Sequence, residues 1–250
     1  MKAAILVVAL SAAVAAPAAG ADKITKKVFS SEGWTRPYYL YVPERAGAGP
    51  SPLIVFLHGS GRNGLILVDK WKDLAKKEGI ILAGPDSKDS QEWNTIGDGP
   101  DVLHDLVETI SKQHPVDPKR VYLFGHSAGA IHGLMMSLLE SEYFAAVAVH
   151  AGALPPDTYS YADRATRKIP LAIWVGTNDR FFSLAAVRAT RDALVAKGLP
   201  VELTEIKGHT HDYYSRSSEI NKAAWAFLRQ HALTAEPVFT KYEIKKVLGF

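Results

Sequence analysis

Hydrophobic residues follow two different spacings along this chain. Short runs of consecutive apolar residues, such as 53–57, are typical of strands buried on both faces, whereas apolar residues at every third or fourth position indicate amphipathic helices. We expect strands at 53–57, 79–83, 120–124, 144–149, 169–175 and 200–206. We expect helices at 68–78, 101–114, 130–136, 183–197 and 218–231. Because strands and helices alternate, the pattern predicts an α/β fold, a mostly parallel central sheet with helices on both faces.

The chain is predicted to form one domain with an antiparallel sheet edge. Segments 24–29 and 36–43 are rich in aromatic residues and alternate between apolar and polar positions, which suits two half-covered edge strands. The loop at 46–52 is too short to link two domains. A length of 250 residues with 47 % hydrophobic residues is enough for one sizeable core, which we assign to residues 22–234. The tail at 235–250 is either docked or disordered.

The first 21 residues have the pattern of a secretory signal peptide. Lys2 is followed by a charge-free apolar run at 3–16 and by small residues at 17–21, which favour cleavage after Ala21, with Ala18 as the alternative. The run is short for a bilayer span, although a retained membrane anchor is the alternative. We therefore expect a secreted or periplasmic protein with no stable membrane association.

Charge and cysteine content exclude several classes of function. The net charge is only +3 and no basic block stands out, so nucleic acid is not an expected partner. The chain contains no cysteine, which excludes disulfides, thiolate catalysis, a lipidated cysteine and cysteine-bound metals.

The segment Gly125-His126-Ser127-Ala128-Gly129 is the strongest chemical signal. It follows the predicted strand at 120–124 and precedes the predicted helix at 130–136, which is the strand–turn–helix context of a nucleophile elbow. In such a turn the serine takes a cramped backbone conformation, and the two glycines let the strand and helix pass closely. We therefore identify Ser127 as the candidate nucleophile.

A serine nucleophile needs an acid that orients its base, and the candidate acid is Asp179. It follows the strand that ends at 175, so its carboxylate is expected at the same sheet edge as Ser127. An Asx turn or an ion pair with Arg180 would also explain this aspartate. Asp157 and Asp163 are rivals, but neither directly follows a strand.

The candidate base is a histidine in the loop after the last predicted strand. His209 and His211 both stand there, so the chain supplies the candidate residues in the order serine, aspartate, histidine. Two histidines two positions apart can also bind a metal, but no third ligand at matching spacing accompanies them. The spacing alone leaves both histidines as candidates for the base.

Two backbone N–H groups are predicted to stabilise an oxyanion. One belongs to Ala128, the residue after the nucleophile, and the other to the turn at 58–61, with Ser60 as first choice and Gly61 as second. A plain strand-to-helix turn would use the same residues. Trp93 and Phe181 are candidates for a substrate-binding wall, with core packing as the alternative. The histidines at 126 and 132 are expected to pack, and those at 104, 114 and 150 to lie in the core or on the surface.

Together these motifs resemble an α/β-hydrolase and, within that fold, the secreted esterases related to polyhydroxybutyrate depolymerase and feruloyl esterase. The similarity covers residues 38–228 and rests on Tyr39-Leu40-Tyr41-Val42-Pro43, Leu57-His58-Gly59, Asp117-Pro118-Lys119-Arg120-Val121-Tyr122, Gly125-His126-Ser127-Ala128-Gly129 and Gly176-Thr177-Asn178-Asp179. The segment His211-Asp212-Tyr213-Tyr214 is similar to the base loop of S-formylglutathione hydrolase-like esterases, which favours His211 over His209. Unlike many secreted relatives, the chain lacks cysteines and an extra substrate-binding domain, which argues against polymer depolymerisation.

The resemblance implies an exported serine esterase. It implies an acyl-enzyme on Ser127, His211 as base and Asp179 as its orienting acid, with no cofactor and no metal. The expected partner is a small-molecule or plant- or polymer-derived ester. A serine peptidase of the same fold and a catalytically silent binding protein are the alternatives.

Overall fold

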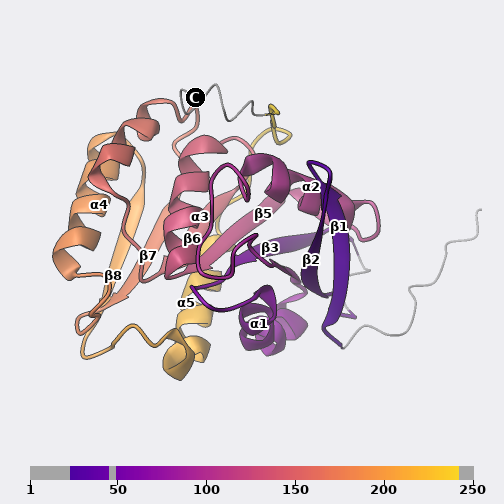
Figure 1. The fold of residues 1–250 in the computed structure, drawn as a ribbon, viewed down its shortest axis with the longest axis horizontal. Coiled ribbons are helices and arrows are strands. Elements are labelled where there is room, and N and C mark those ends of the chain that lie inside the picture. The colour runs from indigo at the N-terminus through magenta and orange to yellow at the C-terminus, as the bar shows by residue number, and fades with distance from the viewer. Residues whose placement is uncertain (1–22, 45–48, 242–250) are drawn as a thin grey trace, which may run out of the picture.

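A twisted eight-stranded sheet forms the centre of the protein in the computed structural model, which describes residues 23–44 and 49–241 (Figure 1). The strands are β1 (Thr25–Ser31), β2 (Trp34–Tyr41), β3 (Ser51–Leu57), β4 (Ile81–Pro85), β5 (Val116–His126), β6 (Ala146–His150), β7 (Leu171–Gly176) and β8 (Val201–Ile206). Their spatial order is β1-β2-β4-β3-β5-β6-β7-β8. All pairs from β4 to β8 are parallel, and β1 and β2 form an antiparallel edge, as predicted.

Helices cover both faces of this sheet. They are α1 (Gly64–Glu78), α2 (Pro100–Ser111), α3 (Ala128–Leu139), α4 (Leu184–Ala196) and α5 (Ser217–Leu228). Helices α1 and α5 lie on one face, and α2, α3 and α4 lie on the other (Figure 1). Along β3, Leu53, Val55 and Leu57 pack into the core under α2 to α4, whereas Ile54 and Phe56 pack into the core under α1. The sheet is therefore buried on both sides, which explains the unbroken apolar run of β3.

Some elements are longer than their sequence pattern. Strand β5 begins at Val116 rather than 120, and α1 begins at Gly64 rather than 68. The backbone N–H of Gly64 donates to Asp86 Oδ1 at 2.9 Å, so a carboxylate from the end of β4 satisfies the first turn of α1. Two short 3₁₀ helices, η1 (Pro156–Asp163) and η2 (Tyr213–Arg216), occupy segments without a regular pattern.

The structure describes part of the C-terminal tail but not the N-terminal segment. The predicted signal peptide at 1–21 lies outside the described residues. The described part of the tail is docked, because Val238 N–H donates to the Glu142 carbonyl at 3.2 Å and the Phe239 ring stacks on His104. None of the helices within 23–44 and 49–241 has the length and apolar character that crossing a bilayer requires.

Candidate active site

Ser127 lies at the sharp turn between β5 and α3, at the carboxyl edge of the parallel strands. Its backbone has φ 58° and ψ −119°, a conformation that is rare for residues with a side chain. The Ser127 N–H donates to the carbonyl of His150, the last residue of β6, at 3.1 Å. A Cβ on Gly129 would lie 1.9 Å from the Leu57 carbonyl oxygen, so only glycine allows α3 to approach β3 this closely. The turn has the geometry of a nucleophile elbow.

The side chains of Ser127, His211 and Asp179 form a hydrogen-bonded row. His211 Nε2 lies 2.9 Å from Ser127 Oγ, and His211 Nδ1 lies 2.9 Å from Asp179 Oδ2. The other carboxylate oxygen of Asp179 accepts the backbone N–H groups of Phe181 and Phe182 at 2.8 and 2.9 Å. Three hydrogen bonds thus fix the carboxylate, which can hold His211 with Nδ1 protonated and Nε2 free to accept the serine proton.

The rival residues have other partners. Asp163 binds the Lys197 ammonium at 2.7 Å, and Asp157 is exposed on η1. His209 is 5 % exposed and contacts His150, so of the two loop histidines it is His211 that reaches Ser127. Among the described residues, no ion pair links Asp179 with Arg180.

A chain of three buried histidines lies behind this row. His126 Nδ1 is 3.1 Å from His150 Nδ1, and His150 Nε2 is 3.1 Å from His209 Nε2. Burial lowers the pKa of His126 to about 4 and that of His150 to about 2, and it also lowers the pKa of His209. All three rings are therefore neutral at pH 7. The His126 ring also lies 5.0 Å from the His211 ring, between centroids.

Sequence reasoning assigns His126 to packing and His150 to the core or the surface, treats His209 as the second candidate for the base, and misses their connection. His126 and His150 each end a strand, and β5 and β6 pair with these two residues opposite each other. The signal in the sequence that could have pointed to this connection is a polar residue at the end of each of two buried strands. The order of the strands, which the sequence does not contain, is needed to bring them together.

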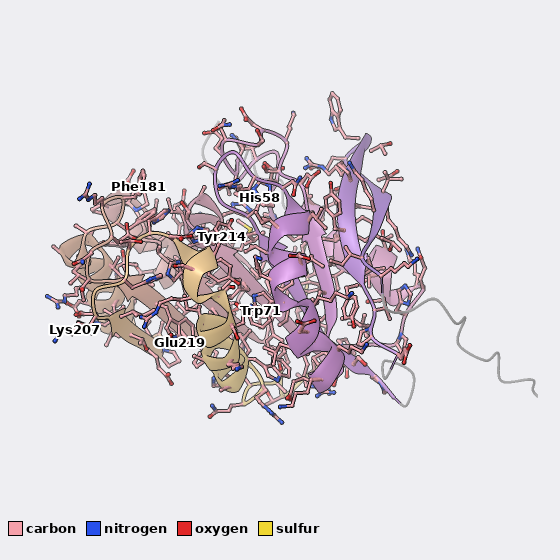
Figure 2. The ribbon with its side chains drawn as sticks, turned by 90° about the horizontal axis from the view of Figure 1, so that it is seen from below. His58, Trp71, Phe181, Lys207, Tyr214 and Glu219 are labelled. Carbon is pink, nitrogen blue, oxygen red and sulfur yellow. The ribbon has the colours of Figure 1, made fainter. Side chains whose placement is uncertain are left out.

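A cavity of about 980 Å³ opens over Ser127. Phe181 lines it, is 78 % exposed, and places its ring 4.7 Å from the His211 ring. Figure 2 shows Phe181, His58 and Tyr214 above the buried Trp71 in that view. Trp93 does not line this cavity. Its indole N–H donates to the His58 carbonyl at 2.8 Å and its ring stacks on His132, so Trp93 packs beside the cavity and its role as a substrate wall stays a prediction.

The turn after β3 approaches the nucleophile. A Cβ on Gly59 would lie 3.3 Å from Ser127 Cβ, and Ser60 lines the cavity. The Gly61 N–H donates to the Ser90 carbonyl at 2.7 Å and is occupied, which leaves Ser60 as the better oxyanion donor of the two. His58 fixes the turn, because its Nδ1 lies 2.9 Å from the Gly59 carbonyl and its Nε2 accepts the Ser87 N–H at 3.1 Å. Ala128, the other predicted donor, begins α3 directly after Ser127.

The described residues hold no group of three or more histidine, aspartate or glutamate side chains arranged for a metal ion. The catalytic roles of Ser127, His211 and Asp179 stay predictions.

Comparison with known sequences identifies a family. The sequence profile of the dienelactone hydrolase family matches residues 87–236. The bifunctional acetylxylan esterase/xylanase XynS20E of Neocallimastix patriciarum is 28 % identical over 152 residues, which are 59 % of this chain and 22 % of that protein. This chain therefore covers less than a quarter of that relative. S-formylglutathione hydrolase of Mus musculus is 21 % identical over 233 residues, covering 71 % of this chain and 82 % of that enzyme.

Comparison with solved structures identifies the fold. A ferulic acid esterase structure superposes with a TM-score of 0.68 at 16 % identity, covering 83 % of this chain and 98 % of that one. This likeness and the mostly parallel sheet confirm the predicted α/β-hydrolase fold.

Proposed function

Because this chain belongs to the dienelactone hydrolase family, we propose that it is a serine hydrolase that cleaves carboxylic esters through an acyl-enzyme on Ser127. The observation that carries the proposal is the pair of 2.9 Å contacts that link Ser127 to His211 and His211 to Asp179. The esterase relatives support ester bonds as the target. A binding protein freed from catalysis would have no reason to keep this row and the strained serine.

In the proposed reaction, His211 Nε2 takes the proton from Ser127 Oγ as that oxygen bonds to the acyl carbon. The carbonyl oxygen becomes an oxyanion, which accepts hydrogen bonds from the Ser60 and Ala128 N–H groups. Collapse of this intermediate breaks the bond to the alcohol, and His211 gives its proton to the leaving oxygen. Water then attacks the acyl-enzyme with His211 again as base, which releases the acid and restores Ser127.

The test compares Ser127→Ala and His211→Ala with Ser137→Ala on an activated ester. Ser137 is a buried serine of α3 whose hydroxyl donates to the Leu134 carbonyl, so it controls for loss of a serine in the same helix. We expect Ser127→Ala and His211→Ala to lose at least about 10⁴-fold in kcat. A fluorophosphonate probe should label the wild type and Ser137→Ala but not Ser127→Ala. Turnover by Ser127→Ala near the wild-type rate would overturn the proposal.

The second part of the proposal is export by a cleaved signal peptide at residues 1–21. Its support is the charge-free run at 3–16 and the small residues that follow it. Protein recovered from the periplasm or medium should have an N-terminus at Asp22 or a few residues earlier. Protein that keeps Met1 and sediments with membranes would contradict export.

A further inference from the structure

The turn at 58–61, which follows β3, contacts the loop at 87–98, which follows β4. Strands β3 and β4 are parallel neighbours, so their carboxyl ends place the turn and the loop at one edge of the sheet. The N–H of Ser60, the better of the two candidate oxyanion donors in the turn, lies between two other peptide units. The direction of this N–H depends on what holds those units and its own.

The loop at 87–98 holds three successive peptide units of the turn, two directly and one through a side chain. The Trp93 indole N–H donates to the His58 carbonyl, in unit 58–59, at 2.8 Å. The Gly61 N–H, in unit 60–61, donates to the Ser90 carbonyl at 2.7 Å. The unit between them, 59–60, is held by the His58 ring, and that ring is held by Ser87.

The His58 ring has one tautomer. Its Nε2 accepts the Ser87 N–H at 3.1 Å, so in a neutral ring the proton is on Nδ1. The ring is neutral at pH 7 because His58 is 1 % exposed and burial lowers its pKa. Nδ1 therefore donates to the Gly59 carbonyl, 2.9 Å away. The Arg62 N–H donates to the same carbonyl at 3.2 Å.

The Gly59 carbonyl determines the direction of the Ser60 N–H. The two groups belong to one planar peptide unit and point in opposite directions. Because two donors hold the carbonyl oxygen, this unit cannot flip without losing both hydrogen bonds. A flipped unit would present an oxygen where the oxyanion needs a donor. Within the described ranges the Ser60 N–H has no acceptor, and Ser60 lines the cavity over Ser127, so this N–H is available to a ligand.

The loop is itself anchored on the Asp98 carboxylate, which is completely buried. Its Oδ1 accepts the Lys88 N–H at 2.9 Å and Arg36 Nη1 at 2.7 Å, and its Oδ2 accepts the Asn94 N–H at 3.1 Å. The carboxylate thus holds the loop on both sides of Trp93 and ties it to β2. Charged hydrogen bonds in a buried site are strong, so the indole has a rigid support.

We propose that Trp93 and His58 are positioning residues that act on the reaction through the Ser60 N–H. Trp93 fixes unit 58–59 and the His58 ring fixes unit 59–60, so the N–H is aimed before a substrate binds. Donors that are already in place stabilise an oxyanion without having to reorient during the reaction. Trp93 then affects kcat rather than substrate binding. This inference rests on the proposed esterase function.

The first experiment compares Trp93→Phe with Trp225→Phe on p-nitrophenyl acetate. Each substitution keeps an aromatic ring and removes one indole donor, and Trp225 is a matched control because it is 7 % exposed and donates from α5 to Glu78 at 3.2 Å. We expect Trp93→Phe to lower kcat about 10- to 50-fold with KM within about twofold, since acylation and deacylation both pass through an oxyanion. Trp225→Phe should stay within about twofold of the wild type. A trifluoromethyl ketone forms an oxyanion on the serine, so its inhibition constant should rise in Trp93→Phe by the factor that kcat falls.

The second experiment compares His58→Asn with His58→Gln. The asparagine amide reaches the place of Nδ1 and can still donate to the Gly59 carbonyl, whereas the glutamine amide reaches the place of Nε2 and serves only Ser87. We expect kcat of His58→Asn to exceed that of His58→Gln by at least about fivefold. A residue that only fills space would show no such preference for the shorter side chain.

Three results would overturn the proposal. They are a raised KM with unchanged kcat in Trp93→Phe, equal losses of kcat in the two tryptophan variants, and His58→Gln at least as active as His58→Asn. If the wild type does not hydrolyse the ester, the esterase proposal fails, and crystal structures of the two tryptophan variants decide the positioning role. The Gly59 carbonyl should then be reoriented in Trp93→Phe and unchanged in Trp225→Phe, and an unchanged turn in both would overturn the role.

Discussion

At the scale of single residues, His150 connects the turn that carries Ser127 with the loop that carries His209 and His211. Its carbonyl accepts the Ser127 N–H, and its ring joins His126 on one side and His209 on the other. Each nitrogen–nitrogen contact needs one proton between the rings, and a neutral imidazole carries one proton in total. Only two arrangements of the protons on the three histidines satisfy both contacts. The tautomer of His126 at the cavity is therefore linked to the tautomer of His209 in the base loop. The ring of His150 therefore fixes the loop that presents His211.

We predict that His150→Leu lowers kcat on an activated ester by about 10- to 100-fold with little change in KM, since His211 loses its position relative to Ser127. His150→Gln, which keeps a donor and an acceptor, should recover part of the loss. His132→Leu is the control. This histidine is also buried, but its Nε2 lies 2.9 Å from the Asp98 carbonyl, so it is not part of the row of contacting histidines. Its kcat should stay near the wild-type value even where stability falls. Equal losses of kcat in the variants at 150 and 132 would reduce His150 to a packing residue.

At the scale of elements, the close approach of α3 to β3 and β5 positions Ser127. A Cβ on Gly125 would lie 2.2 Å from the Gly129 carbonyl oxygen, and a Cβ on Gly129 would meet the Leu57 carbonyl. Gly133, one turn further along α3, is different, because its nearest neighbours are side-chain atoms of Leu57 and Val149 at 3.4 and 3.5 Å. The contact is thus tightest at the elbow and relaxes along the helix.

The same substitution at two glycines of α3 should have opposite effects on stability. Gly129→Ala forces α3 away from β3 and should lower the free energy of unfolding by about 3 kcal/mol or more. Gly133→Ala finds room and improves helix propensity, so it should raise that free energy by about 0.5–1 kcal/mol. Urea unfolding followed by circular dichroism measures both values. If Gly129→Ala is as stable as the wild type, the described helix–strand contact is wrong.

At the scale of the whole molecule, buried neutral histidines make stability depend on pH. Burial lowers the pKa of His126 and of His132 to about 4, and that of His150 to about 2. In the unfolded chain each of these groups takes up a proton near pH 6.5. Between pH 6.5 and 4 the unfolded state binds more protons, so stability rises with pH and is lost as pH falls through this window.

The free energy of unfolding should therefore decrease from pH 7 to pH 5, by on the order of 2 kcal/mol for each of the three imidazoles. Carboxylates titrate mainly below this range, which leaves histidine as the principal cause. Urea unfolding at pH 7.0, 6.0 and 5.0 measures the change. A free energy that is constant or larger at pH 5 would show that these rings are protonated in the folded protein.

The sequence by itself determined the elements and the neighbourhood of the site. Periodicity reports which side of each segment is buried, so the strands, the helices and the parallel sheet could be predicted. The glycines around Ser127 encode a steric requirement that is local, and Asp179 and His211 follow strands whose carboxyl ends must share one edge. Spacing alone could not separate His209 from His211, and only the resemblance did.

Tertiary structure decided everything that depends on distances between remote segments. The strand order puts His150 between His126 and His209, and loop folding packs Trp93 against the core while Phe181 reaches the cavity. The antiparallel return of β2 brings Trp34 to the same edge as Ser127. Periodicity contains none of this, because it reports which side of a segment is buried and not which other segments cover that side. Which side chains meet there depends on the order and register in which the strands pair.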